Sequence, residues 1–177
     1  MKAVGFILLI GLCNSAFSQD TFSNQLNKIL ADTSNYFSSI KGEFKKAYDR
    51  FDDKDSAFYL KINLVGLRET EYVKVGSYYF IQGLITDSVS EKKGKQILKE
   101  WKKRIRSVVG KSFTVKKDDR LKPADHSWVF KKDDVEISIL LNRMLGEPKY
   151  PYFYVSFSIQ TWNQADFLKT IKEDAKE

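Results

Sequence analysis

Hydrophobic and polar residues recur with two different periods along this chain, and each period predicts one type of secondary structure. In residues 22–40 the apolar positions return about every 3.6 residues, which is typical of an amphipathic helix. Residues 43–51 extend this spacing and predict a second, short helix. The clearest helical pattern covers residues 88–110, where Ser88 and Glu91 have the spacing of a capping box and Gly110 ends the apolar stripe.

Between and after these helical patterns lie strand-like segments, and the alternation of apolar and polar residues that is typical of a half-buried strand is clearest in the first and the last of them. Such segments lie at residues 58–64, 72–84, 113–115, 128–132, 135–142 and 152–162. Gly76 and Gly83 predict a bend, bulge or break in the second of them. Asp133 and Asp134 predict a hairpin turn between the fourth and the fifth. Asn163 is a candidate cap for a short terminal helix.

The order of these elements predicts the fold class. Neighbouring alternating strands joined by short turns favour an antiparallel sheet. The two long amphipathic helices need an apolar surface to cover, and the dry face of the sheet supplies one. We therefore predict an α+β domain, a two-layer antiparallel sheet with two long amphipathic helices packed on one face. No sequence repeat or interdomain linker divides the chain.

The first eighteen residues have the pattern of a secretory signal peptide. Lys2 precedes a short apolar run, and Ala16 and Ser18 have the small-residue spacing of a cleavage site. The run is far shorter than the ~20 residues that span a bilayer, which argues against a membrane anchor. We therefore predict a signal peptide at residues 1–18 and a single α+β domain at residues 19–177. N-terminal sequencing of the protein from its host would test the cleavage.

Cysteine and histidine are too scarce for most metal and nucleophile chemistry. Cys13 is the only cysteine and falls in the predicted signal, so the exported chain is expected to form no disulfide. His126 is the only histidine, which excludes the common zinc frameworks. The acidic cluster at residues 49–55 lacks the spacing and the glycine of a calcium loop. We predict no metal, no cofactor and no catalytic residue, with enzymatic activity left open.

The predicted helix at residues 88–110 carries a broad basic face. Its cations recur at steps of three and four residues and so lie side by side on a helix. The candidate anion-binding residues are Lys95, Lys99, Lys102, Lys103 and Arg106. They favour an anionic ligand such as phosphate, sulfate, an acidic glycan or lipid headgroups, whereas nucleic acid is not expected for an exported protein. A run of charges on a helix is more often a solvated face whose lysine stems cover apolar neighbours.

The second candidate surface is the side of the sheet that the helices do not cover. In residues 152–162, Phe153, Val155 and Phe157 point to one face, so the residues between them point to the other. The candidate ligand-binding residues of this open face are Tyr59, Lys61, Tyr152, Tyr154 and Ser156. Tyrosine offers a rigid ring with a polar tip, which suits a protein or glycan partner. Ordinary cross-strand pairing of tyrosines is the alternative.

These observations predict an exported, non-catalytic binding or accessory protein of the bacterial cell envelope, periplasmic or secreted, that binds through its open sheet face. The alternative is a hydrolase for an anionic envelope substrate. A homodimer formed through the tyrosine face is a third hypothesis.

Overall fold

The computed structural model describes residues 21–47, 56–118, 127–143 and 152–163. An α-helical segment at residues 21–31 opens the described chain. The 3-10 turn η1 (Thr33–Asn35) and the strands β1 (Lys41–Ala47), β2 (Ser56–Leu60), β3 (Arg68–Val75) and β4 (Tyr78–Val89) follow. Next come the helix α2 (Glu91–Val109), the 3-10 turn η2 (Gly110–Ser112) and the strands β5 (Thr114–Lys117), β6 (Ser127–Lys132), β7 (Val135–Arg143) and β8 (Phe153–Trp162).

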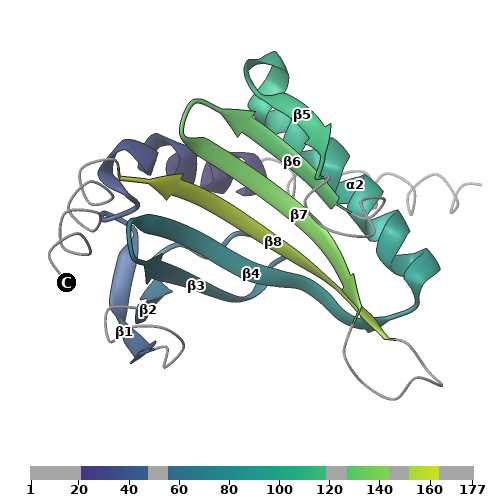
Figure 1. Ribbon diagram of the computed structural model, residues 1–177, viewed down its shortest axis with the longest axis horizontal. Coiled ribbons are helices and arrows are strands. Elements are labelled where there is room, and N and C mark those ends of the chain that lie inside the picture. The colour runs from purple at the N-terminus through teal and green to yellow at the C-terminus, as the bar shows by residue number, and fades with distance from the viewer. Residues whose placement is uncertain (1–20, 48–55, 119–126, 144–151, 164–177) are drawn as a thin grey trace, which may run out of the picture.

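The strands form one open antiparallel sheet of eight strands in the order β1-β2-β3-β4-β8-β7-β6-β5. Each half of the described chain is a helix followed by four consecutive strands, and the two halves meet where β4 pairs with β8. Figure 1 shows this central pair running through the middle of the molecule, with strands of the two halves on either side. The architecture thus repeats although the sequence does not.

One row of side chains crosses the whole sheet and defines its inner face. Strand partners in direct register point to the same side of a sheet. The row consists of Phe44, Phe58, Tyr72, Ile81, Ile159, Ile137, Phe130 and Val115, one residue from each strand. Every member is hydrophobic or aromatic, and the five from Tyr72 to Phe130 are buried. The inner face is therefore the base of the hydrophobic core.

The helices cover this inner face. Helix α2 packs against β7 and β8, and Trp101 is one of its buried residues. The Trp101 ring meets Phe22 of the 21–31 helix edge-on, with 5.5 Å between the ring centroids, and lies 5.8 Å from the ring of Phe157 in β8. In Figure 1 both helices lie behind the strands. Within the described residues, no helix combines the length and the apolar character that crossing a membrane requires.

The fold is α+β, as predicted, but only one helix within the described residues is long. The helical pattern of residues 22–40 gives an α-helix that ends at residue 31. Tyr36 and Phe37 take positive φ angles of 54° and 59°, which a helix does not accept. Phe37 and Ile40 are nevertheless buried, so their spacing reflects core packing rather than helical geometry.

The predicted short helix at residues 43–51 is wrong over its described part, because residues 41–47 form the edge strand β1. The alternating segment at residues 72–84 is two strands, since a turn at Gly76 (φ 54°) separates β3 from β4. Helix α2 begins later than the capping-box spacing indicated. Its N-cap is Ser90, whose hydroxyl accepts from the Lys93 amide at 3.3 Å, and Gly110 ends it as expected. The terminal helix predicted after Asn163 lies outside the described residues.

Tyr72 in the inner row makes stability depend on alkaline pH. Burial raises the pKa of the Tyr72 hydroxyl from 10.0 to about 12. The folded state therefore prefers the neutral phenol, and this preference is fully present below pH 10. As the pH rises from 10 towards 12, the unfolded chain ionises first and the free energy of unfolding should fall by on the order of 2 kcal/mol.

Chemical denaturation across this pH range would measure the effect. The matched variant is Tyr72→Phe, which keeps the ring and cannot ionise, and its stability should fall less. Equal slopes for the two proteins would contradict the assignment to Tyr72.

Candidate functional site

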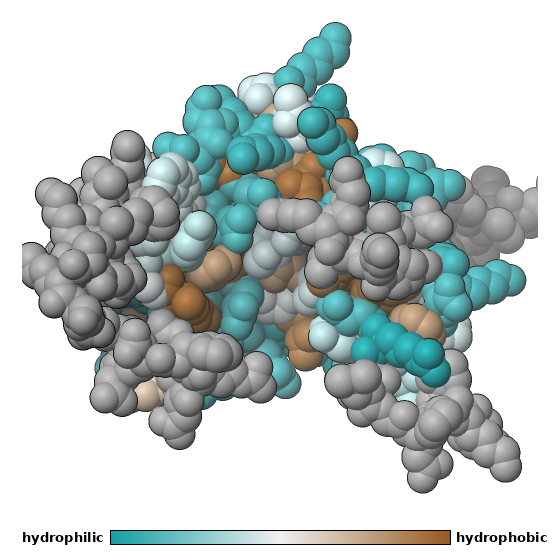
Figure 2. Space-filling view, viewed as in Figure 1, coloured by the Kyte–Doolittle hydropathy of each residue, from teal (hydrophilic) through white to brown (hydrophobic). Residues whose placement is uncertain are grey.

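Strand β8 separates the two faces of the sheet cleanly. Val155, Phe157 and Ile159 point into the core and are at most 1 % exposed. Ser156 and Ser158, which alternate with them, point to the open face, as the sequence pattern predicted. Figure 2, taken from the same side as Figure 1, shows hydrophilic and hydrophobic residues interspersed on the visible surface rather than one apolar patch.

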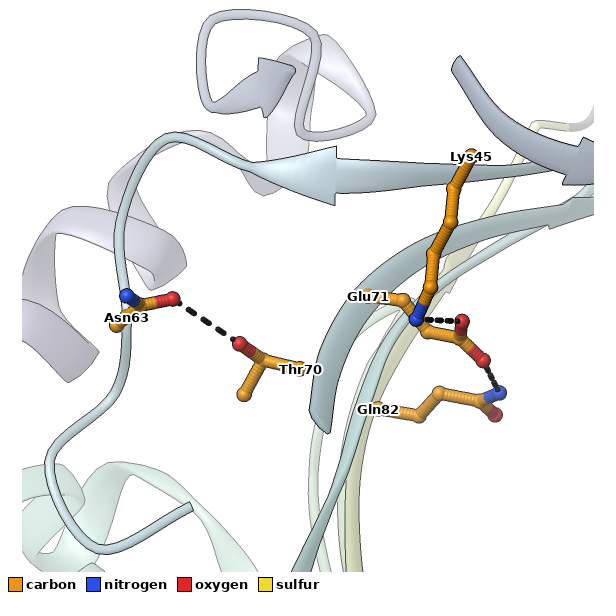
Figure 3. Close-up of polar contacts among 5 residues, drawn as sticks. All are labelled: Lys45, Asn63, Thr70, Glu71 and Gln82. Atoms are coloured by element: carbon orange, nitrogen blue, oxygen red, sulfur yellow. Dashed lines mark hydrogen bonds and ion pairs between the residues drawn. The ribbon is translucent and has the colours of Figure 1, made fainter. Parts of the chain in front are cut away.

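A line of hydrogen-bonding groups crosses the open face, and we call it the polar ladder. It consists of Lys45 (β1), Glu71 (β3), Gln82 (β4), Ser158 (β8) and Ser138 (β7). The Lys45 Nζ donates to Glu71 Oε2 at 3.1 Å, and Gln82 Nε2 donates to Glu71 Oε1 at 2.8 Å (Figure 3). Gln82 is the register partner of Ser158, whose hydroxyl lies 2.7 Å from that of Ser138.

All members of the ladder except Lys45 line a cavity of about 390 Å³ at the centre of the open face. Tyr154, Ser156, Leu84 and Leu140 complete much of the lining, and Glu69 also contributes. Ser156 accepts a hydrogen bond from Asn142 Nδ2 at 3.2 Å. The cavity lies where the two halves of the sheet meet, because its lining comes from β3, β4, β8 and β7.

Glu71 is the most constrained member of the ladder. Its side chain is only 10 % exposed, whereas that of Lys45 is 27 % exposed. A buried carboxylate is costly unless it is paired with a cation and hydrogen-bonded, and Lys45 and Gln82 meet both needs. The ion pair leaves this part of the open face close to neutral.

Glu69 lies beside the cavity in strained backbone. Its φ angle is 52°, and the register between β3 and β4 shifts between Arg68 and Glu71. Such a bulge inserts an extra residue and changes the direction of the strand's side chains. Glu69 and Glu71 both contribute to the cavity lining.

A second hollow follows along β8 beyond the ladder, with a volume of about 500 Å³. Gln160 and Trp162 of β8 line it together with Tyr78 of β4. The Trp162 indole donates from Nε1 to Asp134 Oδ1 at 3.0 Å, which fixes the ring. From Tyr154 to Trp162, each outward residue of β8 therefore lines one of the two hollows.

The predicted open-face residues divide into three places. Tyr154 and Ser156 line the central cavity. Tyr152 is 55 % exposed and immediately precedes β8. Tyr59 and Lys61 line a separate hollow of about 570 Å³ between β1 and β2. Tyr59 is still linked to the ladder, because its ring centroid lies 5.6 Å from the Nζ of Lys45.

Sequence reasoning missed Lys45, Glu71, Gln82, Ser138 and Ser158 as a group. The sequence pattern predicts a bend, bulge or break at Gly76 but does not show that the strands on either side pair with each other, as Glu71 and Gln82 do. Lys45 was placed in a helix. The alternation of β8 alone indicated that Ser158 faces outward.

The cations of the predicted anion-binding face have different surroundings on α2. Lys95 forms an ion pair with Glu91 at 2.6 Å, and Lys99 and Lys103 are exposed. Lys102 lies over the ring of Trp128, with its Nζ 2.9 Å from the centroid.

Two further cations of the helix are tied to neighbouring backbone. The Arg106 guanidinium donates to the Phe113 carbonyl at 2.7 Å, and that of Arg104 donates to the Val65 carbonyl at 3.2 Å.

Burial, and then the charges of Arg106 and Lys117, lower the pKa of Lys102 below its usual value. Burial likewise lowers the pKa of Arg104.

Several residues considered from the sequence lie outside the described residues, namely Cys13, His126 and the acidic cluster at 49–55. In the described part of the chain, no group of three or more histidine, cysteine, aspartate or glutamate side chains is arranged to hold a metal ion.

Comparison with known proteins identifies no relative of this chain. No family model matches the sequence, and neither a curated protein nor a solved structure is similar to it.

Proposed function

We propose that this is an exported binding protein that holds a neutral, hydrogen-bonding ligand, a glycan in the first place, on the open face of its sheet. The central cavity is the binding site in this proposal. The observation that supports it most is the polar ladder, which lines a cavity of about 390 Å³ at the junction of the two halves.

A sheet face that only contacts solvent does not need a cavity lined by short polar side chains. Its central positions would suit long charged side chains or threonine, which cover a sheet without leaving a hollow. Here Ser138, Ser156 and Ser158 are short, and their hydroxyls bond to neighbouring side chains. The fold also retains the nearly buried carboxylate of Glu71 at the cavity wall, an expensive feature that is common at binding sites.

The chemistry of the lining favours a neutral polyhydroxylated ligand. A serine hydroxyl both donates and accepts, and the amide of Gln82 does the same, so these groups suit the hydroxyls of a sugar. Tyr154 contributes a ring against which a sugar face can pack. Because Lys45 balances Glu71, the site carries no excess positive charge for an anion. A segment of a protein partner is the second ligand that these groups suit.

The hydrolase alternative is less well supported. Two carboxylates, Glu69 and Glu71, line the cavity, and hydrolysis of glycosides requires such a pair. The substrate of that alternative is anionic, however, and the described lining of the cavity contains no lysine or arginine to hold an anion.

A variant that fills the cavity tests the proposal. Ser156→Trp places an indole in the cavity and should abolish capture of the ligand. Ser34→Trp is the matched control, because Ser34 is exposed in η1 on a different part of the molecule and its variant should bind normally. Binding would be measured on a panel of neutral and acidic envelope glycans and by pull-down from envelope extract at low and high salt.

Equal binding by both variants would contradict the proposal, provided that their melting temperatures agree. Capture of a protein but of no glycan would replace the glycan by a protein partner. A wild-type dimer that dissociates in Ser156→Trp would replace both by a second copy of the chain.

A further inference from the structure

Nearly all the net charge of this protein lies on one helix. Helix α2 carries eight lysine or arginine residues and two glutamates, a net formal charge of +6, whereas the whole chain has +7. The rest of the chain is therefore close to neutral in sum. A single strongly basic element on a nearly neutral body produces a large asymmetry of electrostatic potential.

Three lysines of α2 point away from the core. The buried residues of α2 are Gly94, Leu98, Trp101, Ile105 and Val109, which form one stripe along the helix. Lys92, Lys99 and Lys103 lie on the opposite side, at spacings of seven and four residues, and all three are exposed. Within the described residues, no ion pair or hydrogen bond engages the side chains of these three lysines.

This basic face has the character of a diffuse docking surface rather than a discrete anion pocket. Arginine is the residue that grips a single phosphate with two parallel hydrogen bonds. The guanidinium groups of Arg104 and Arg106 already donate to the carbonyls of Val65 and Phe113. The exposed lysines are flexible point charges, and none of the three hollows described above is lined by a residue of α2.

We propose that the exposed face of α2 docks on the surface of a lipid bilayer that contains anionic headgroups. The exposed lysines from Lys92 to Lys103 extend over ~17 Å of the helix, which suits a flat surface that is negative over several headgroups. The apolar stripe of α2 is buried in the core, so nothing on this face inserts into the acyl chains. Docking therefore depends on charge alone and is reversible and sensitive to salt.

The position of α2 determines how the docked molecule is oriented. The helix packs on the inner face of β7 and β8, and the central cavity lies on the opposite face of the same strands. In Figure 1 the sheet lies in front of α2. A protein docked through α2 thus presents the cavity to the solution. The docking itself does not require that the cavity bind a ligand.

Vesicle binding of the full chain tests the docking. The test variant is Lys99→Gln/Lys103→Gln, and the matched control is Lys116→Gln/Lys131→Gln, which removes two exposed charges from the open side of β5 and β6. Residues 1–18 are present in all three proteins, so their contribution to vesicle binding cancels. Vesicles of phosphatidylcholine alone are compared with vesicles of about one third phosphatidylglycerol, in salt of about 0.1 M and about 1 M, where the screening length falls from ~10 Å to ~3 Å.

We expect the wild type to prefer the anionic vesicles at low salt and to lose this preference at high salt. The α2 variant should bind them about 25-fold more weakly, about fivefold for each lysine, and the control pair within about twofold of the wild type. Equal loss in both variants would overturn the proposal, because net charge and not α2 would then decide binding.

Two further measurements test whether the basic face prefers another anion to the vesicle surface. Release from the vesicles by millimolar inorganic phosphate at constant ionic strength would overturn the proposal in favour of a discrete phosphate site. Stronger binding to duplex DNA than to the vesicles, lost in the α2 variant, would overturn it in favour of a nucleic-acid surface.

Discussion

Trp101→Ala should destabilise the protein by about 3–5 kcal/mol. The Trp101 side chain is 7 % exposed and joins three elements, because it contacts Phe22 of the 21–31 helix and Phe157 of β8 from its own position on α2. The Arg104 guanidinium also lies over this aromatic pair, with its central carbon 3.9 Å from the Phe22 ring centroid. Removing the indole leaves a cavity that a helix and a sheet cannot close without moving.

Urea denaturation of the variant and the wild type measures the change. Lys99→Ala is the control on the same helix, and because Lys99 is exposed its effect should stay within about 0.5 kcal/mol. A loss below about 1 kcal/mol for Trp101→Ala would show that the ring does not hold the helices to the sheet.

The second large effect is expected at the polar ladder. Lys45→Met should destabilise the protein by about 2–3 kcal/mol, because it leaves the charge of Glu71 in a nearly buried position without this cation. The estimate is below the usual range for breaking a buried pair, since Gln82 continues to donate to the carboxylate and Lys45 is partly exposed.

A double variant separates charge from packing. Lys45→Met/Glu71→Gln removes the buried charge as well as its partner, so it should recover most of the lost stability. Denaturation of the wild type, both single variants and the double variant gives the coupling between the two residues. Additive losses would contradict the ion pair as the cause.

Only part of the candidate site was accessible from the sequence. Alternation in residues 152–162 correctly assigned Val155, Phe157 and Ile159 to the core, and it placed Tyr154 and Ser156 on the open face. It gave no information on which strands lie beside them. Gln82 and Ser138 flank Ser158 because β4 and β7 pair with β8.

For the basic helix α2 too, the sequence showed the local features but not the contacts with distant residues. Its stripe of apolar residues and its cations are local features of the sequence, and both are present in α2. The sequence did not separate the cations with local partners from the others. Lys102 lies on Trp128, which is distant in the chain, whereas Lys99 and Lys103 remain exposed.

Local patterns in the sequence are sufficient to predict the α+β class, helix α2 and its end, the hairpin of β6 and β7, and the two faces of β8. Each of these depends on the period of apolar residues or on a turn residue, which are properties of short segments. Three features became visible only in the folded chain: residues 41–47 form an edge strand, the two halves of the sheet meet at β4 and β8, and Lys45 neutralises Glu71. These features depend on contacts between residues far apart in the chain, and many pairings of eight short strands satisfy the same local pattern.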